Sequence, residues 1–214
     1  KAIIFTDRGI IYDRNKVELT WNKPARNADS LAIEGAKTDN SPLPTRAYLS
    51  PGFSHLLGYV SYPTVDSSGN YWQSEFIGKD GLEKQYNYIL KGENGSKIIE
   101  IDALGKIYSE NIVNAPKKGA DLITTIDSKI QTELFALIKN LSESNAFAGG
   151  AGIIMDARNG EIITSTSFPE YNSEILSLGK DTKKINNYLV DKRKVFLDRT
   201  ISGLYTPGSI IKPF

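Results

Sequence analysis

Ser209 and Lys212, near the end of the sequence, have the residue types and spacing of a nucleophile and its base. A serine hydroxyl is a poor nucleophile until a neighbouring group accepts its proton. A lysine can accept that proton when desolvation or nearby positive charge lowers the lysine pKa and leaves part of the population neutral. Residues three apart lie on one face of a helix. A serine at the helix start also benefits from free N–H groups and the positive end of the dipole.

The Ser-x-x-Lys pattern is weak by itself, because the chain holds 19 serines and 19 lysines and chance gives about 1.7 matches. Two matches occur. Ser177 to Lys180 contains a glycine and lies in a stretch with few helix signals. Ser209 to Lys212 follows a Pro-Gly pair that favours a turn into a helix start, and its inner residues are both isoleucine. We therefore favour Ser209 and Lys212 as the catalytic pair, the alternative being a surface turn that leads into a helix.

The composition excludes several classes of function. The net charge is +1 and no basic block occurs, so nucleic-acid binding has no electrostatic basis. Cysteine is absent, which excludes disulfides, zinc–cysteine sites and thiol nucleophiles. The single histidine, His55, cannot form a multi-histidine metal site, and we expect it to be structural. No apolar stretch of about 20 residues and no signal peptide is visible.

The first half of the chain is predicted to consist of strands joined by turns. Alternating apolar and polar residues over 10–21 predict a hairpin that turns at 13–16. The apolar spacing over 80–95 predicts one helix. A second hairpin is predicted over 96–110, with its turn at 103–106.

The pattern changes after a polar connection over residues 114–121, which is the candidate domain boundary. Residues 127–144 carry the apolar stripe of an amphipathic helix. The stripe comprises Ile130, Leu134, Leu137, Ile138 and Leu141. Ser128 with Gln131 fits a capping box at the helix start, and Asp127 is the alternative cap. An Asn-Gly pair at 159–160 between two apolar runs predicts a hairpin, and residues 185–200 have a helical pattern.

Several segments, in a fixed order along the chain, resemble penicillin-binding proteins. YTPGSIIKPF resembles the active-site segment of that family, with Ser209 matching the acylated serine and Lys212 its base. DLITTIDSKIQTEL, GAGIIMDARNGEIITSTSFPEYN and LDRTISGLYTPGS resemble successive parts of the family's transpeptidase domain. RGIIYDRN, HLLGY, GKDGLEKQY and LKGENG resemble the pedestal domain of class B members, and GKDGLEKQY favours an elongation-type protein.

The resemblance implies an α+β protein with two parts. A β-rich, elongated pedestal would span residues 1–115, and the N-terminal part of an α/β serine transpeptidase domain would span 116–214. The implied activity is that of a peptidoglycan D,D-transpeptidase. Ser209 would attack the penultimate D-Ala carbonyl of a stem peptide, D-Ala would leave, and an amine of a neighbouring stem would take the acyl group. No metal or organic cofactor is implied.

The resemblance also implies partners and a location. Peptidoglycan stem peptides would be the substrates, and β-lactam antibiotics would acylate the same serine. A membrane glycosyltransferase and cell-shape scaffold proteins would be partners, and nucleic acid would not. We expect a membrane anchor upstream of Lys1, in sequence that has been removed, and a position on the extracytoplasmic, periplasmic side of the bacterial cytoplasmic membrane.

The sequence departs from the family pattern in three places. The Ser-x-Asn and Lys-Thr-Gly motifs do not follow Ser209, so we expect an N-terminal portion of a longer enzyme that is inactive alone. Lys16 stands where the family usually has glycine, and the segment over 22–46 is short. A β-lactamase or β-lactam sensor, and a non-catalytic docking module, remain alternatives.

Charged residues near the start of the chain could suggest a paired-charge site. They are Asp7, Arg8, Asp13 and Arg14. Turn and salt-bridge roles fit them better, because charged side chains beside a predicted turn commonly hydrogen-bond the local backbone or pair with each other.

Overall fold

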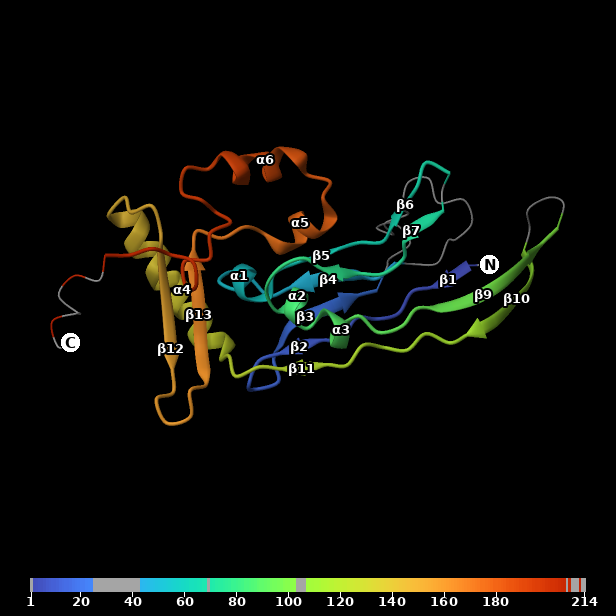
Figure 1. The fold of residues 1–214 in the computed structure, drawn as a ribbon, viewed down its shortest axis with the longest axis horizontal. Coiled ribbons are helices and arrows are strands. Elements are labelled where there is room, and N and C mark those ends of the chain that lie inside the picture. The colour runs from blue at the N-terminus through green and yellow to red at the C-terminus, as the bar shows by residue number, and fades with distance from the viewer. Residues whose placement is uncertain are drawn as a thin grey trace.

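The computed structural model describes residues 2–24, 43–68, 70–102, 107–206, 208 and 212, and it is elongated (Figure 1). Strands β9 (Gly95–Ile101) and β10 (Ile107–Asn114) form one end. Helix α4 (Ser128–Ser144) and the strands β12 (Gly150–Met155) and β13 (Ile162–Phe168) lie toward the other. The mixture of helices and strands confirms the predicted α+β class.

A four-stranded sheet in the order β11-β2-β3-β4 forms the middle of the molecule. Its strands are β2 (Ile11–Tyr12), β3 (Glu18–Lys23), β4 (Thr45–Tyr48) and β11 (Leu122–Ile123). Strands β2 and β3 pair antiparallel, which confirms the hairpin predicted over 10–21. Asp13 holds its turn, since Oδ1 accepts hydrogen bonds from the N–H groups of Asn15 and Val17. Strand β11 pairs parallel with β2, so the chain returns to this sheet after β10.

A three-stranded sheet in the order β1-β9-β10 forms the far end, with β1 spanning Ala2–Ile4. The antiparallel pairing of β9 with β10 confirms the hairpin predicted over 96–110, while its expected turn at 103–106 lies outside the described residues. This sheet exposes large apolar side chains, those of Ile98, Ile107, Tyr108, Ile112 and Val113. Within the described ranges, this sheet therefore has less cover than the central sheet.

Seven short elements follow one another along the described chain between β4 and β9. They are α1 (Ser54–Leu57), α2 (Gly81–Gln85), α3 (Asn87–Leu90), β5 (Val60–Ser61), β6 (Thr64–Val65), β7 (Tyr71–Gln73) and β8 (Ile77–Gly78). The single helix predicted over 80–95 is wrong, because the helix breaks at Tyr86 into α2 and α3. Just after the break, Asn87 accepts a hydrogen bond from the Gly78 N–H at 2.9 Å. This bond joins the start of α3 to β8.

The main hydrophobic core lies between the central sheet, α1 and α3. Its buried members are Ile11, Leu19, Tyr48, Phe53, Leu57, Leu90 and Ile126. Two glycines bring backbones together beside it. A Cβ added at Gly9 would lie 2.0 Å from the carbonyl oxygen of Ala120, and one at Gly119 would lie 1.9 Å from that of Leu90. Only glycine allows these two crossings, because any other residue would place its Cβ inside a backbone atom.

Helix α4 confirms the amphipathic helix predicted over 127–144 and packs on the β12–β13 hairpin, which confirms the strands predicted around 159–160. The expected capping box of Ser128 and Gln131 is wrong. Asp127 is the cap, because its side chain accepts hydrogen bonds from the N–H groups of Lys129 and Ile130. Ser128 and Gln131 bond to other parts of the fold instead.

The apolar stripe of α4 is only partly used for packing. Leu134 and Ile138 lie against the glycines of β12, since a Cβ added at Gly152 would lie 2.8 Å from the Leu134 side chain. Leu137 and Leu141, in contrast, are 66% and 61% exposed. The fully buried face of the helix carries Gln131 and Phe135 instead.

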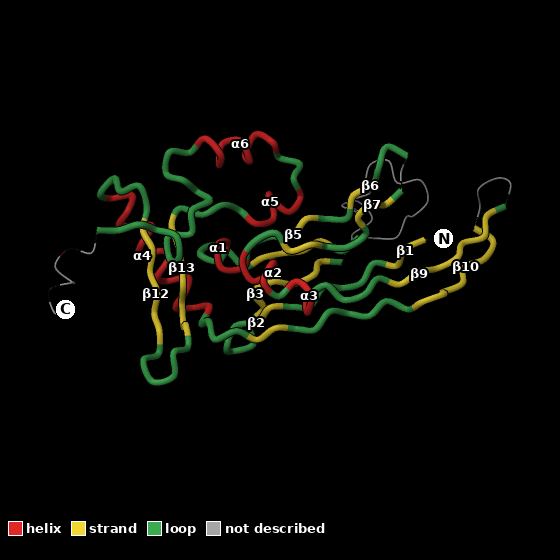
Figure 2. Tube along the Cα trace, viewed as in Figure 1, coloured by secondary structure: helices red, strands yellow, loops and turns green. Residues whose placement is uncertain are grey.

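Two helices follow the hairpin, α5 (Ser173–Leu178) and α6 (Thr182–Val190). The stretch around Ser177 has few helix signals in the sequence, yet it forms helix α5, so the interpretation of it as non-helical is wrong. The helix predicted over 185–200 is right only as far as Val190, because Figure 2 shows the chain beyond α6 as loop. In that loop Asp191 accepts a hydrogen bond from the Arg193 N–H, which favours a turn over a continued helix.

Candidate active-site segment

The predicted catalytic pair falls largely beyond what the structure describes. Ser209 lies outside the described residues, whereas Lys212 is described as an exposed residue in a turn. Gly208, which directly precedes Ser209, has a φ of 60°, in the left-handed region that glycine tolerates better than other residues do. The pairing of Ser209 with Lys212 therefore stays a prediction.

The chain that leads to Ser209 is held at one point. Val195 is 2% and Arg199 is 9% exposed, although both lie in loop. After Arg199 every described residue up to Thr206 is half-buried or exposed, and Leu204 is fully exposed. Arg199 is thus the last buried residue of the described chain before Ser209.

Arg199 makes its contacts through both its side chain and its backbone. Its guanidinium donates to the carbonyl oxygens of Arg193, Lys194 and Leu197, the last two at 3.5 and 3.4 Å. Its backbone N–H donates to the Ser167 hydroxyl at 3.1 Å, and that hydroxyl donates to the Leu197 carbonyl at 3.3 Å. Ser167 lies in β13, so these bonds join the loop to the hairpin.

The second Ser-x-x-Lys match is a packing residue rather than a nucleophile. Ser177 is buried on α5, with its hydroxyl 3.4 Å from the Tyr48 hydroxyl and accepting from the Val60 N–H at 3.3 Å. Helix α5 ends at Gly179, which has a left-handed backbone. Lys180 follows that end, so Ser177 and Lys180 do not share a helix face.

His55 has the structural role that we expected. The residue is buried, and its Nε2 lies 3.2 Å from the Pro169 carbonyl oxygen, a distance at which an N–H can donate. Its ring also packs edge-on against Tyr171, with centroids 5.1 Å apart. Both contacts join α1 to the segment after β13.

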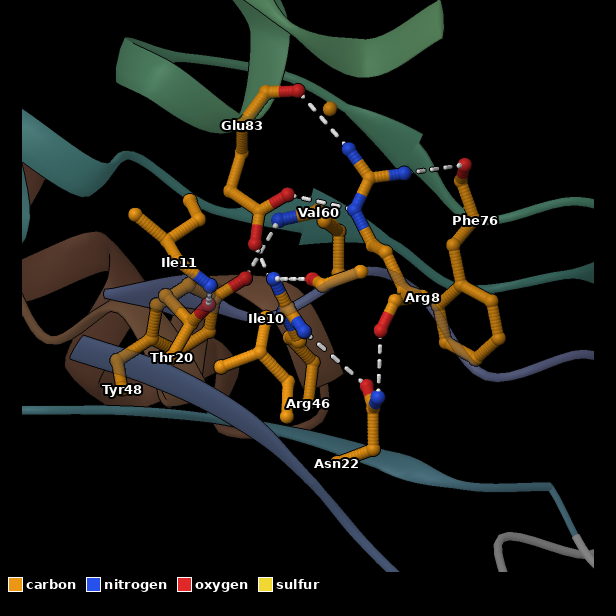
Figure 3. Close-up of polar contacts among 12 residues, drawn as sticks. Arg8, Ile10, Ile11, Thr20, Asn22, Arg46, Tyr48, Val60, Phe76 and Glu83 are labelled. Atoms are coloured by element: carbon orange, nitrogen blue, oxygen red, sulfur yellow. Dashed lines mark hydrogen bonds and ion pairs between the residues drawn. The ribbon is translucent and has the colours of Figure 1, made fainter. Parts of the chain in front are cut away.

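A buried charge cluster joins three parts of the first half (Figure 3). Glu83 on α2 accepts from the Nε of Arg8 at 2.6 Å and from the Nε of Arg46 at 2.8 Å, and all three side chains are at most 1% exposed. Arg8 precedes β2 and Arg46 lies on β4, so one carboxylate on α2 holds the segment before β2 and the strand β4.

Every guanidinium nitrogen of the cluster has a hydrogen-bond acceptor, and this points to a structural role. The other two nitrogens of Arg8 donate to the carbonyl oxygens of Phe76 and Glu83. Those of Arg46 donate to the side-chain oxygen of Asn22 and the carbonyl oxygen of Gly9. Burial lowers the pKa of Arg8 from its usual value, while the charge of Glu83 opposes that effect. Because water and substrate cannot reach these groups, the expected salt-bridge role of Arg8 is confirmed.

Asp13 joins the first half to α4. Its Oδ2 accepts from the Ser128 hydroxyl at 2.7 Å and from the Ser128 N–H at 3.1 Å. Burial would raise the pKa of Asp13, but the hydrogen bonds from Ser128, Val17 and Asn15 outweigh it, and the net effect lowers that pKa. The carboxylate is therefore held in its charged form.

Gln131 makes a second connection of this kind. Its Nε2 donates to the carbonyl oxygens of Gly52 and Ser165, each at 2.7 Å. Its Oε1 accepts from the Thr164 hydroxyl at 2.6 Å and from the Ser165 N–H at 2.8 Å. In the sequence, the one sign of this role is that Gln131 is a polar residue close to the apolar stripe of the predicted helix.

Glu170 completes the contact between the two halves. Its carboxylate accepts from the N–H groups of Gly52 and Ser54, at 2.7 and 3.0 Å, at the start of α1. The neighbouring Tyr171 hydroxyl lies 3.0 Å from a carboxylate oxygen of Asp80, and burial raises the pKa of that hydroxyl. Sequence reasoning gave none of these contacts.

The described residues give no sign of a metal centre or a membrane span. No group of three histidine, aspartate or glutamate side chains among them is arranged to hold a metal ion. No helix within the described ranges is both long enough and apolar enough to cross a bilayer.

Comparison with known proteins places the chain in a family. Residues 32–124 match the model of the penicillin-binding protein dimerisation domain. Peptidoglycan D,D-transpeptidase MrdA of Acinetobacter baumannii is 30% identical over 167 residues, which are 75% of this chain and 24% of that protein. Penicillin-binding protein 3 of Bacillus subtilis is 30% identical over 219 residues, which are 97% of this chain and 30% of that protein. The chain thus spans about a quarter to a third of the length of these relatives.

Solved structures extend the comparison to the fold. Penicillin-binding protein 2 of Helicobacter pylori, solved in complex with MreC, has a TM-score of 0.70 and 26% identity and covers 99% of this chain and 50% of its own. Penicillin binding protein 2X of Streptococcus thermophilus has a TM-score of 0.63 and 21% identity, covers 84% of this chain and 37% of its own, and supports the fold alone. The chain therefore belongs to the penicillin-binding proteins, with a dimerisation domain and close homology to the peptidoglycan D,D-transpeptidases of the penicillin-binding protein 2 type.

Proposed function

We propose that the whole protein is a serine-type peptidoglycan D,D-transpeptidase that acylates Ser209 and is inhibited by β-lactams. The observation that supports this most is the homology across both halves, which reaches 97% of the chain in one relative. Sequence likeness to the D,D-transpeptidases MrdA covers 75% of the chain.

In the proposed reaction, Lys212 accepts the proton of the Ser209 hydroxyl as its oxygen attacks the penultimate D-Ala carbonyl of a stem peptide. The C–N bond to the terminal D-Ala breaks, and that proton leaves with its amine. An amine of a second stem peptide then attacks the acyl-enzyme, which forms the crosslink and frees the serine. General-base help of this kind is worth about 10² to 10⁴ in rate. No step requires a metal or an organic cofactor.

We propose a division into a pedestal over residues 1–115 and a transpeptidase part over 116–214. Strand β11 crosses that division, because it pairs with β2 of the first part although it belongs to the second. The connection from β10 to α4 is therefore held on the central sheet, which would fix the direction in which α4 starts.

We propose that the protein is anchored in the cytoplasmic membrane by a segment before Lys1, with this chain on the periplasmic side. A cell-shape scaffold protein and a membrane glycosyltransferase would be its partners. A relative of the same fold forms a complex with MreC. The exposed apolar side chains of β9 and β10 offer a surface at the end opposite α4 for such a scaffold partner.

A fluorescent penicillin and the full-length protein test the choice of serine. We expect one covalent label, on Ser209, which Ser209→Ala abolishes and Ser177→Ala retains. Peptide mapping locates the label, and a label on Ser177 would overturn the assignment. Rapid hydrolysis of the β-lactam, without crosslinking of peptidoglycan precursors, would instead indicate a β-lactamase.

The same probe tests the isolated 214-residue chain. We expect no stoichiometric label, because Lys212 is exposed and catalysis of acyl transfer depends on pre-organised donors around the developing oxyanion, each worth about 10² to 10³ in rate. A label lost in Ser209→Ala would show that the pair suffices by itself. Binding of the scaffold partner by the chain, unchanged in Ser209→Ala, would support a docking role.

A further inference from the structure

A turn before the proposed nucleophile is built around one arginine. The loop over residues 191–199 contains Lys194, whose φ of 53° is unfavourable for a residue with a side chain. Within this turn, the carbonyl oxygens of Arg193, Lys194 and Leu197 converge on the guanidinium of Arg199. The Lys194 carbonyl also accepts from the Leu197 N–H at 2.9 Å and the Leu197 carbonyl from the Ser167 hydroxyl at 3.3 Å, so the guanidinium completes a hydrogen-bonded turn and supplies the donor for the Arg193 carbonyl.

The guanidinium also lies against the end of the β12–β13 hairpin. A Cβ added at Gly149, directly before β12, would lie 2.8 Å from Nε and 2.9 Å from Cζ of Arg199. On the other strand, the Ser167 hydroxyl accepts from the Arg199 N–H and donates to the Leu197 carbonyl. Arg199 therefore lies beside Gly149, just before the start of β12, and is hydrogen-bonded to Ser167, near the end of β13.

The direction of the chain beyond Arg199 is set in the same place. Asp198 accepts hydrogen bonds from the hydroxyl and the N–H of Thr200, at 2.6 and 2.9 Å. The Asp198 carbonyl accepts from the Ser202 N–H at 2.9 Å. No described residue between Arg199 and Ser209 is buried, so this turn is the last buried point of the described chain before the serine.

We propose that Arg199 is a positioning residue for acylation of Ser209. It acts through the turn over 193–199, which it fixes against the hairpin, and it does not touch the substrate. The inference rests on the proposed function of Ser209. Misplacement of reacting groups by about 1 Å can reduce a rate by about 10², so looseness at this anchor would appear in the chemical step.

The test is the acylation of the full-length protein by a fluorescent penicillin, with the acylation rate constant and the dissociation constant of the noncovalent complex measured separately. In Arg199→Ala we expect the rate constant to fall by about tenfold or more and the dissociation constant to change far less. Guanidinium ions, well below denaturing concentrations, should restore part of the rate. Arg199→Lys should be intermediate, because a single ammonium group does not reproduce the planar, forked donors with which a guanidinium meets three carbonyls.

Arg193→Ala is the matched control. It removes an arginine from the same turn, but that side chain is exposed and pairs with Asp191, and only its backbone carbonyl meets Arg199. We expect its rate constant to match the wild type. A folded Arg199→Ala protein with a wild-type rate constant would overturn the proposal, even if its thermal stability were lower.

Two further outcomes are also informative. If Arg199→Ala does not fold, Arg199→Lys and Ser167→Ala, which weaken the same anchor, decide the question by the same rate constants. If the wild type is not acylated on Ser209 at all, the proposed function fails, and with it the premise of this inference. A wild type acylated at Ser209 with unaffected variants refutes the inference alone.

Discussion

The middle of the first half buries charged side chains, whereas the outer side of α4 and β12 exposes large apolar ones. In the first, even charged groups are closed off, since Arg8, Arg46 and Glu83 are at most 1% exposed. In the second, large apolar side chains face outward, among them Leu137, Leu141, Ile153 and Met155. The difference indicates that the contacts which hold the fold together are concentrated in the first region. Equivalent substitutions should therefore have unequal effects.

The largest effect is expected from Glu83→Gln. The change leaves two buried guanidinium groups without their carboxylate, and loss of one partner from a buried ion pair destabilises by about 3–5 kcal/mol. The free energy of unfolding from urea titration should fall by that amount. Glu93→Gln breaks an exposed ion pair with Lys117 and should have little effect. Equal losses in the two variants would mean that the buried cluster contributes no more than a surface pair.

Replacing one leucine by alanine in each region compares how much an apolar side chain contributes to stability in the two. Leu57 is 0% exposed in the main core, whereas Leu137 on α4 is 66% exposed. Leu57→Ala should lower the free energy of unfolding by about 2–5 kcal/mol through lost burial and a cavity. Leu137→Ala should change it by less than about 0.5 kcal/mol. A large loss in Leu137→Ala would show that this face is covered in solution.

Asp13 lies between the two regions, and its contribution should depend on pH. Because its pKa is lowered in the folded protein, its stabilising effect is complete above the unfolded pKa of about 3.9 and is lost as the pH falls through the folded value. Asp13→Asn should cost about 1–3 kcal/mol at neutral pH. The gap between wild type and variant, followed by urea unfolding, should narrow below about pH 4. A gap that stays constant across that range would contradict the assignment.

The smallest effect is expected at the start of α4. Asp127→Ala removes the helix cap and should lower the free energy of unfolding by about 1 kcal/mol. Ser144→Ala, at the exposed end of the same helix, is the control and should be nearly neutral. Chemical unfolding measures both. A neutral Asp127→Ala would mean that the hydrogen bonds from Lys129 and Ile130 add nothing in water.

Local patterns predicted the hairpins and α4 well. The alternation over 10–21 and the Asn-Gly pair at 159–160 depend on neighbours in sequence, and the structure confirms both hairpins. The same reasoning put the capping box of Ser128 and Gln131 ahead of Asp127, the alternative that the structure shows, and predicted one helix where there are α2 and α3. At the cap a distant partner is involved, since Ser128 bonds to Asp13, and after the break at Tyr86 the Asn87 side chain bonds to Gly78 of β8.

The candidate site could be predicted only as a motif. Residue types and spacing singled out Ser209 and Lys212, and the structure explains independently why Ser177 is unsuitable, because its hydroxyl is buried against Tyr48 and Val60. The role of Arg199 could not be predicted, because its partners are backbone carbonyls. Every residue carries such a group, so a sequence pattern does not mark them.

The two glycine crossings beside the core have a consequence for how this sequence can change over generations. Every non-synonymous change at Gly9 or Gly119 adds at least one carbon atom where a carbonyl oxygen already lies about 2 Å away. No residue is smaller than glycine, so no substitution at these positions avoids the clash, and a stepwise change of residue is not possible there. In a library of all single variants, we expect both positions to tolerate no substitution, while Gly160, with nothing within 4 Å of its added carbon, tolerates at least asparagine and aspartate.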